Sequence, residues 1–360
     1  NGDIKLDEKN NDIKVMGNNH IDEEQNMEDM WTKLQNEMNN INFEETKDPL
    51  FMKENPYIHE NNVFDIAKEE MKNGNVKDAR FALEAEVQNN PDNSDAWLML
   101  GKMHTENDRD DLAMQCFMKA LEVDPFNTEA MLNLGISCTN EFDQFEAMIY
   151  INNWIKYHHQ YSKFYDKNNA LLNYDLIKDE MMKDNDHEDY YQKGVRIESL
   201  KNNFYNQILE LLETIAKSHS DVNLWIAMGI GHFIPHNYER AIECFREAVR
   251  LNPNDHNAWN KLGAMLAHSK INEEAIATYK KALQIKPDYA RCWANLGIAY
   301  FNMDDYRGAV DCFGKALSIC DIPHVWSYMN SVLVALNRAD LMECVYKKDL
   351  NQIMSQLSLK

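Results

Sequence analysis

The sequence has few glycines and prolines for its length, 12 and 8 among 360 residues. Sandwiches and barrels built from many short strands need more of these turn-forming residues, so such folds are disfavoured. Hydrophobic residues make up 44% of the chain, which is enough to bury a core. The composition therefore favours an all-helical protein.

Basic residues are scarce as well. The chain has 37 lysines and arginines against 59 aspartates and glutamates, a formal net charge of −22. Nucleic acids and anionic membrane surfaces are bound by basic faces, so neither is an expected partner. A cationic partner, or one attracted by a local patch of charge, fits this net charge better.

Long apolar runs and paired cysteines are also missing. No run reaches the roughly 18 residues of a membrane span, and no charged-then-apolar leader opens the chain. Seven cysteines are scattered without a CxxC pair, which is typical of reduced core thiols in a cytosolic protein. We expect a soluble, unexported protein with no metal and no cofactor. Because residue 1 is Asn rather than Met, we expect a fragment of a longer chain.

Two rare residue types recur at one interval. Pro91 and Pro125 are 34 residues apart, as are Pro253 and Pro287. The same interval separates three tryptophans, Trp225, Trp259 and Trp293. Thirty-four residues is the length of the tetratricopeptide unit, which has aromatic, Leu and Gly positions in a first helix, then Ala, aromatic, Ala and a closing Pro in a second. The spacing therefore predicts a tetratricopeptide array.

Four units match this pattern at nearly every position, and they begin at Ser94, Val222, His256 and Ala290. The unit that begins at His256 has Trp259, Leu262, Gly263, Ala275, Tyr279, Ala282 and Pro287. Weaker units begin near Glu60 and at Thr128. The small Gly and Ala positions allow the two helices to cross closely, and the aromatics fill the gap between neighbouring units.

Each hairpin leaves an apolar face that only the next hairpin covers. We therefore predict an all-α tetratricopeptide-repeat superhelix of about seven repeats, the fourth degenerate, with a C-terminal helical cap. First helices should line its inner groove.

The remaining stretches set the expected domain boundaries. Residues 1–48 carry far more acidic than basic side chains and few apolar ones, which predicts a disordered tail. Repeats 1–3 are expected over 49–161 and repeats 5–7 over 222–322. Between them, 162–221 contains one clear helical pattern, 197–217, behind a charged run; we expect an insertion and a degenerate repeat 4 that act as a hinge. Residues 323–360 show the spacing of two or three capping helices.

Positions 2, 5, 6, 9, 12 and 13 of each first helix fall on one stripe facing the groove. Amide and basic side chains gather on this stripe: Asn140, Asn260, Lys261, Arg291, Asn295 and Asn302. Asparagine competes with its own backbone in helices, so folding alone does not explain the cluster.

A carboxamide pairs with a peptide bond through both its N–H and its oxygen, so this stripe suits an extended peptide backbone. Lys261 and Arg291 add positive charge inside an acidic protein, which suits a free carboxylate at the end of that peptide. The residues alone leave open the alternative that these are ordinary solvated groove side chains.

The sequence resembles the peroxin 5 family, the import receptors for C-terminal peroxisomal targeting signals. The similarity covers about residues 42–350 and lies in FEETKDPLFMKENPY before the first repeat, DAWLMLGKMHTEND in the second, NLGISCTNE in the third, AWNKLGAMLA in the sixth and YARCWANLGIAYFN in the seventh. The resemblance implies a seven-repeat ring that binds cargo proteins ending in a Ser-Lys-Leu-like tripeptide and does no chemistry on them.

The resemblance also implies roles for single residues. The four asparagines of the stripe would hold the tripeptide backbone, with Lys261 and Arg291 near its carboxylate. An apolar pocket for the terminal leucine would be shaped by Ile136, Thr139 and Ala264. Acidic candidates for the basic residue one place earlier are Glu106 and Glu141, although the residues alone leave both equally explained as solvated side chains.

Two positions depart from the family pattern. His268 replaces a further groove asparagine, which opens the way to pH-dependent signal binding, and Ala299 replaces a small hydroxyl residue. Since the expected binding residues come from repeat 3 and from repeats 6 and 7, we expect a bound peptide to close the ring.

The family's N-terminal half, which contacts the peroxisomal docking machinery, is not recognisable in this chain. By resemblance, the receptor works in the cytosol and cycles to the peroxisomal membrane, without stable membrane insertion by this fragment.

Two other functions compete with a targeting receptor. A co-chaperone clamp would hold the acidic C-terminus of a heat-shock chaperone through several Lys and Arg in consecutive repeats, whereas asparagine dominates this groove. A general scaffold is the second alternative. An enzyme carrying such repeats would need a further catalytic domain, and fewer than fifty residues follow the last repeat.

Overall fold

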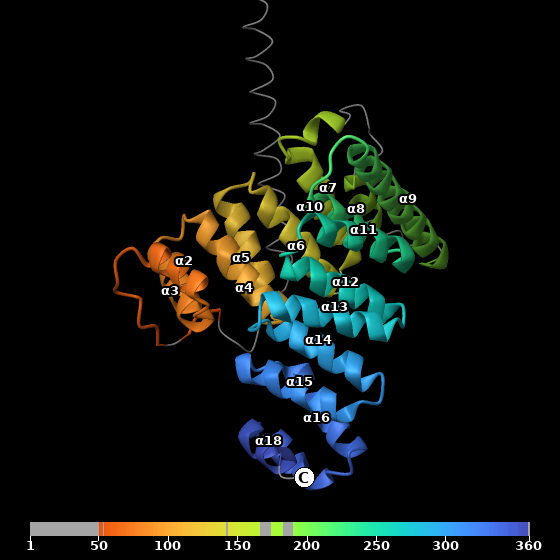
Figure 1. Cartoon of the computed structure of the whole chain (residues 1–360). Coiled ribbons are helices and arrows are strands. Elements are labelled where there is room, and N and C mark those ends of the chain that lie inside the picture. The colour runs from red at the N-terminus through yellow and green to blue at the C-terminus, as the bar shows by residue number, and fades with distance from the viewer. Residues whose placement is uncertain (1–49, 53, 142, 166–173, 183–189, 359–360) are drawn as a thin grey trace, which may run out of the picture.

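The computed structural model describes residues 50–52, 54–141, 143–165, 174–182 and 190–358. Helices dominate these residues, and none of them forms a β-strand. The α-helices follow one another as antiparallel pairs stacked in chain order (Figure 1). This confirms the predicted all-α tetratricopeptide-repeat superhelix.

Two groups of six helices form the repeats, and a further group follows them at the end of the chain. The first six, which form repeats 1–3, are α2 (Val63–Asn73), α3 (Val76–Asn89), α4 (Ser94–Glu106), α5 (Asp110–Val123), α6 (Thr128–Asn140) and α7 (Gln144–Tyr157). The six of repeats 5–7 are α10 (Val222–Phe233), α11 (Tyr238–Leu251), α12 (His256–His268), α13 (Asn272–Ile285), α14 (Ala290–Phe301) and α15 (Tyr306–Ile319). After them come α16 (Pro323–Ala335), η3 (Ala339–Leu341), α17 (Met342–Tyr346) and α18 (Leu350–Ser358).

Glycine permits the close crossing of the two helices in each strong repeat. A Cβ atom placed on Gly263 would lie 2.6 Å from Tyr279 Cε1, and the equivalent pairs are Gly101 with Phe117, Gly229 with Phe245 and Gly297 with Phe313. The alanines opposite, such as Ala275, are fully buried. The predicted role of the small residues is therefore confirmed.

Tryptophan and proline are coupled by a hydrogen bond between repeats. The indole N–H of Trp259 donates to the Pro253 carbonyl oxygen at 2.9 Å, and Trp97 and Trp293 make the same bond to Pro91 and Pro287. Each bond ties the end of one repeat to the first helix of the next. This explains why the two residue types keep one interval.

The stretch between the two groups of repeats contains more helix than the sequence predicts. The predicted helix over 197–217 lies within α9 (Tyr190–Ala216), which begins seven residues earlier. A second helix, α8 (Asp175–Met182), and a short turn, η1 (Ser162–Phe164), precede it. Residues 166–173 and 183–189 of the predicted hinge, and the whole predicted tail 1–48, lie outside the described residues.

The superhelix curves until separated repeats touch. Besides their neighbours in sequence, α4 contacts α14 and α6 contacts α10. The first helices α4, α6, α10, α12 and α14 thereby surround an inner cavity. At the end of the stack, α16 and α18 pack on α15.

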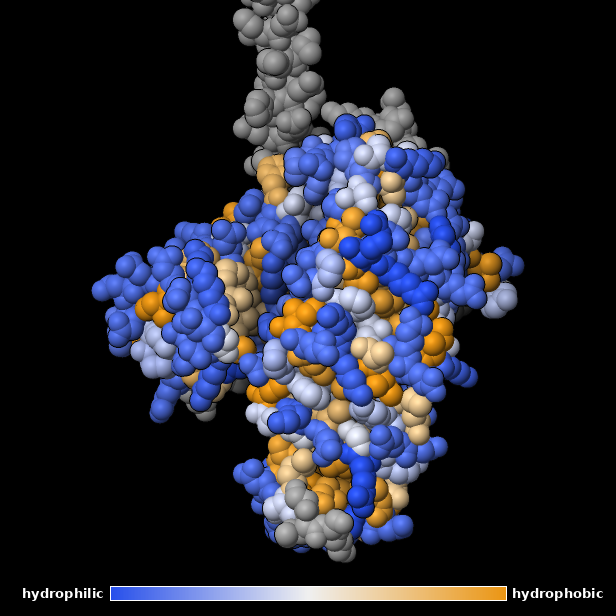
Figure 2. Space-filling view, in the orientation of Figure 1, coloured by the Kyte–Doolittle hydropathy of each residue, from blue (hydrophilic) through white to orange (hydrophobic). Residues whose placement is uncertain are grey.

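The surface seen in Figure 2 is mainly hydrophilic, with hydrophobic side chains scattered between the helices. All seven cysteines are free thiols, and six of them are buried. No described helix combines the length and the apolar character that crossing a membrane would require.

Candidate functional site

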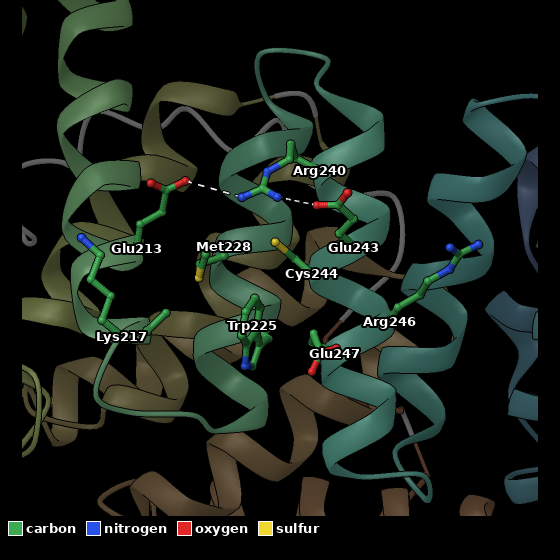
Figure 3. A pocket seen from close by; sticks show the side chains of 10 residues that line it. Glu213, Lys217, Trp225, Met228, Arg240, Glu243, Cys244, Arg246 and Glu247 are labelled. Carbon is green, nitrogen blue, oxygen red and sulfur yellow. Dashed lines mark hydrogen bonds and ion pairs between the residues drawn. The ribbon is translucent and has the colours of Figure 1, made fainter.

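Two cavities compete as candidate sites. One lies between α9, α10 and α11, has a volume of about 580 Å³ and contains Trp225 (Figure 3). Most of its rim charges have ion-pair partners within the protein, and Arg240 lies between Glu213, at 3.9 Å, and Glu243. Arg246 is paired with Glu274 at 2.7 Å. This cavity therefore offers little unpaired charge to a ligand.

The other candidate is the inner cavity, with a volume of about 810 Å³. It collects residues that lie far apart in sequence, from repeats 2 and 3 on one side and repeats 5, 6 and 7 on the other. Ten of the eleven residues expected from the sequence line it: Glu106, Ile136, Thr139, Asn140, Glu141, Asn260, Lys261, Ala264, Arg291 and Asn295.

A row of amide groups crosses from α14 to α12. Asn295 Nδ2 donates to Asn260 Oδ1 at 3.1 Å, and Asn260 Nδ2 donates to the Tyr289 hydroxyl at 3.2 Å. Asn260 is buried, whereas Asn295 is half-buried and lines the cavity. These bonds fix the orientation of Asn260 and leave the Asn295 carbonyl oxygen as an acceptor for a ligand.

Lys261 brings an uncompensated positive charge into the cavity. Its ammonium group has no hydrogen bond and no ion pair within the part of the chain that the structure describes. Burial and the nearby charge of Arg291 lower the pKa of Lys261 to about 8, although Asp110 and Asp255 act in the opposite direction. A desolvated, unpaired cation favours an anionic ligand.

Arg291, in contrast, is already paired. Its Nε lies 3.0 Å from Asp108 Oδ1, and its terminal nitrogen Nη2 pairs with Asp110. Asp110 Oδ2 also accepts a 3.0 Å hydrogen bond from Asn140 Nδ2. Asp110 therefore links an expected binding residue of repeat 3 to one of repeat 7.

Of the two acidic candidates, Glu106 is paired within the described part of the chain and Glu141 is not. His256 Nε2 lies 2.8 Å from a carboxylate oxygen of Glu106, and Lys286 pairs with the other oxygen. Burial alone raises the pKa of Glu106, but the His256 hydrogen bond and the Lys286 charge outweigh it and hold the pKa below its usual value. Glu141 has no such side-chain partner among the described residues. Its pKa is raised by partial burial and by the charges of Asp110 and Asp111.

The apolar part of the cavity lies beside the amides. Ile136 is buried and lines the cavity together with Thr139 and Ala264. The Thr139 hydroxyl donates to the Ile136 carbonyl oxygen at 2.6 Å, so its methyl group is the part left for packing. Further apolar lining comes from Leu132, Ile226, Ile230 and Met265.

Three further positions were singled out in the sequence, and only one of them lines the cavity. Asn302 does not line the cavity: it follows α14 as its C-cap, about two turns beyond Asn295, with an exposed side chain. His268 lines the cavity and stacks on Tyr238 at a centroid distance of 5.9 Å. Burial lowers the pKa of His268. Ala299 is buried and is not among the lining residues.

Five residues that organise the site were not predicted from the sequence: Asp108, Asp110, His256, Tyr289 and Lys286. The prediction rested on the inner stripe of the first helices, whereas Asp108 lies in a turn, Asp110 begins a second helix and Lys286 follows one. Asp108 occupies left-handed backbone with φ 60°, as do Lys270 and Asp304 at the equivalent turns. An acidic residue at that repeat position was the available signal.

Family models match three parts of the chain. The tetratricopeptide domain of cytochrome c-type biogenesis protein H matches residues 52–159, and tetratricopeptide-repeat models match 236–290 and 290–321. Among solved structures, YrrB, a tetratricopeptide-repeat protein described as having an unusual peptide-binding site, covers 69% of this chain and 98% of its own at 14% identity and a TM-score of 0.32.

Characterised proteins with similar sequences have names that go beyond the repeat type. Peroxisome biogenesis protein 5 of Arabidopsis thaliana is 40% identical over 112 residues, which is 31% of this chain and 15% of that protein. The peroxisomal targeting signal receptor of Saccharomyces cerevisiae is 28% identical over 204 residues, 56% of this chain and 30% of the relative. The corresponding receptor of Komagataella phaffii is 28% identical over 216 residues, which is 59% of this chain and 34% of the relative.

The chain thus covers about a third or less of the length of these relatives. The similarity confirms the resemblance inferred from the sequence: the chain carries tetratricopeptide repeats and is related to the peroxisomal targeting signal receptors. The matched relatives are named as receptors or biogenesis proteins, and the matched models describe repeats rather than an enzyme family.

Proposed function

We propose that this chain is the cargo-binding part of a peroxisomal targeting-signal receptor, and that its inner cavity binds the C-terminal Ser-Lys-Leu-like tripeptide of cargo proteins. One observation carries the proposal: the unpaired ammonium of Lys261 shares the cavity with the amide row of Asn260 and Asn295. An anion site beside amides that pair with peptide groups suits the free end of a chain. The relatives support the same class of ligand.

The chemistry of the cavity lining supports the following position for the peptide. Its terminal carboxylate lies at Lys261, and its backbone pairs with Asn295 and Asn140. The terminal leucine packs on Ile136, Ala264 and the Thr139 methyl group. Glu141, which has no side-chain partner, accepts the basic residue one place earlier, whereas Glu106 is occupied by two cations of the protein itself.

The names of the relatives support the peroxisomal part of the proposal. We propose further that the receptor binds cargo in the cytosol and cycles to the peroxisomal membrane, where segments outside this chain contact the docking machinery. It changes no covalent bond of its cargo.

A fluorescence polarisation titration tests this function. A labelled peptide ending in Ser-Lys-Leu with a free carboxylate should bind at least tenfold more tightly than the same peptide ending in an amide, because each charge-assisted hydrogen bond contributes roughly 1.5–3 kcal/mol. A peptide ending in Asp after a run of glutamates should not compete. Equal binding of the free acid and the amide would reject carboxylate recognition and favour the scaffold function, while preferential binding of the acidic peptide would favour the co-chaperone clamp.

A further inference from the structure

We infer that the two cations of the inner cavity have different tasks: Lys261 contacts the ligand carboxylate, whereas Arg291 is a positioning residue that holds repeat 2 against repeat 7. The resemblance implies the same task for both. The inference rests on the proposed function and assigns its carboxylate recognition to one residue.

Arg291 is committed to contacts within the protein. Its side chain is 10% exposed and faces two carboxylates, Asp108 at 3.0 Å and Asp110. Three such groups together carry a net negative charge. A ligand carboxylate placed on this guanidinium would have to approach two like charges in a desolvated setting, which is strongly unfavourable.

Lys261, on α12, has no such carboxylate partners within the described part of the chain. It has no ion-pair partner among the described residues, and it lines the cavity next to the buried amide of Asn260. Asp110 and Asp255 act on it only through space, without a hydrogen bond. Of the two cations, Lys261 alone therefore has a charge that no ion pair within the described residues neutralises.

Arg291 belongs to a set of contacts that we call the seam. On the repeat 2 side the seam contains Glu106, Asp108 and Asp110. The opposite side supplies His256, Lys286, Arg291 and His324, the last from α16 at 3.3 Å from Asp108. The seam coincides with the place where α4 meets α14, so it closes the ring around the cavity.

The two tasks have different consequences for binding. Loss of a seam contact loosens the ring and weakens every peptide that needs both walls, whatever its C-terminal group. Loss of the carboxylate contact weakens only peptides that end in a free carboxylate. The ratio of free-acid to amide affinity therefore separates the two roles.

The experiment compares three variants with the wild-type chain, using the free-acid and amide forms of one peptide ending in Ser-Lys-Leu. Lys261→Gln should reduce the affinity ratio from at least about tenfold to near one and leave amide binding almost unchanged. Arg291→Gln should weaken both forms by a similar factor and keep the ratio within twofold of wild type. Lys286→Gln is the matched control, because Lys286 is a seam cation that does not line the cavity, and it should behave like Arg291→Gln.

A fourth variant keeps the test decisive if Arg291→Gln fails to fold. Asp110→Asn keeps Arg291 but removes its partner, so it should weaken both peptides, preserve the ratio and speed hydrogen exchange in α4 and α14. A collapse of the ratio in Arg291→Gln, or tighter free-acid binding in Asp110→Asn, would show that Arg291 reads the carboxylate and would overturn the inference alone. If the wild-type chain does not distinguish the acid from the amide, the proposed function itself is wrong.

Discussion

The guanidinium of Arg291, at the start of α14, forms an ion pair with the carboxylate of Asp110, at the start of α5 and 181 residues earlier in the chain. This pair joins repeat 2 to repeat 7 across the inner cavity. The sequence predicts that a bound peptide draws the two halves together, whereas in the structure direct protein contacts already join them. We therefore expect a bound peptide to tighten a ring whose walls the seam already holds.

Replacing Asn295 tests the amide row. Asn295→Ala should weaken signal binding by about tenfold, since an unpaired buried peptide group costs about 1–3 kcal/mol, and should change stability little. Asn302→Ala, at the C-cap of the same helix, is the matched control, and we expect less than a twofold change because Asn302 lies outside the cavity. Polarisation titrations of both variants give the answer. An equal loss in Asn302→Ala would mean that the peptide reaches along α14 beyond the cavity.

The pKa of Lys261, lowered to about 8, predicts a pH dependence of binding. A carboxylate ligand favours the protonated amine, so free-acid affinity should be full below pH 7 and fall by up to about tenfold at pH 9 as the free protein loses this proton. The amide peptide should show no such fall. The pKa of His268 is lowered, so this histidine is already neutral in the same range.

The control for this prediction is Lys261→Gln, whose free-acid affinity should be flat between pH 7 and 9. A wild-type ratio of acid to amide affinity that stays constant across that range would contradict the assignment of the carboxylate to Lys261.

The repeat spacing predicts which residues line the groove, but it does not predict their ion-pair partners. The period of 34 residues and the helical stripe place Asn260, Lys261 and Asn295 correctly on one wall, because both are local properties of the chain. The partners of Glu106 and Arg291 lie 150 and 181 residues away, so they depend on the curvature of the whole stack. Periodicity also cannot show where the cavity ends, which is why Asn302 shares the stripe but not the cavity.

In the predicted insertion, 162–221, the sequence pattern likewise predicts one helix and not the other. The apolar pattern over 197–217 predicts most of α9, because its buried face includes Phe204, Ile208 and Leu212. Helix α8 has no comparable pattern, since it is short and exposes Leu176, Met181 and Met182. Its formation depends on packing against α9 rather than on its own periodicity.

A pair of glycines tests the packing of the repeats. Gly263→Ala should destabilise the array by about 1–3 kcal/mol, because the new Cβ would lie 2.6 Å from the Tyr279 ring. Gly194→Ala in α9 is the matched control, since nothing lies within 4 Å of its Cβ, and it should stabilise by about 0.5–1 kcal/mol through helix propensity. Thermal unfolding of both variants measures the difference. A neutral Gly263→Ala would mean that the crossing has room to spare.

His104 predicts acid sensitivity of the fold. Burial lowers its pKa to about 4, and the Nε2 atom has no hydrogen-bond partner. The unfolded chain, with a pKa near 6.5, binds the proton first, so this contribution to stability is present above about pH 6.5 and is lost as the pH falls toward 4, by roughly 3 kcal/mol. The difference in unfolding free energy between wild type and His104→Gln should therefore change with pH in that window. A constant difference would exclude this role.

The central claim is that the inner cavity holds the C-terminus of a signal peptide, and a crystal structure of the chain with a Ser-Lys-Leu peptide tests it most directly. We predict that the terminal carboxylate lies about 3 Å from Lys261 Nζ, that the peptide backbone pairs with the amide of Asn295 and that the Arg291–Asp110 pair stays intact. A peptide bound instead in the cavity between α9, α10 and α11, or a carboxylate seated on Arg291 with Asp110 displaced, would contradict it.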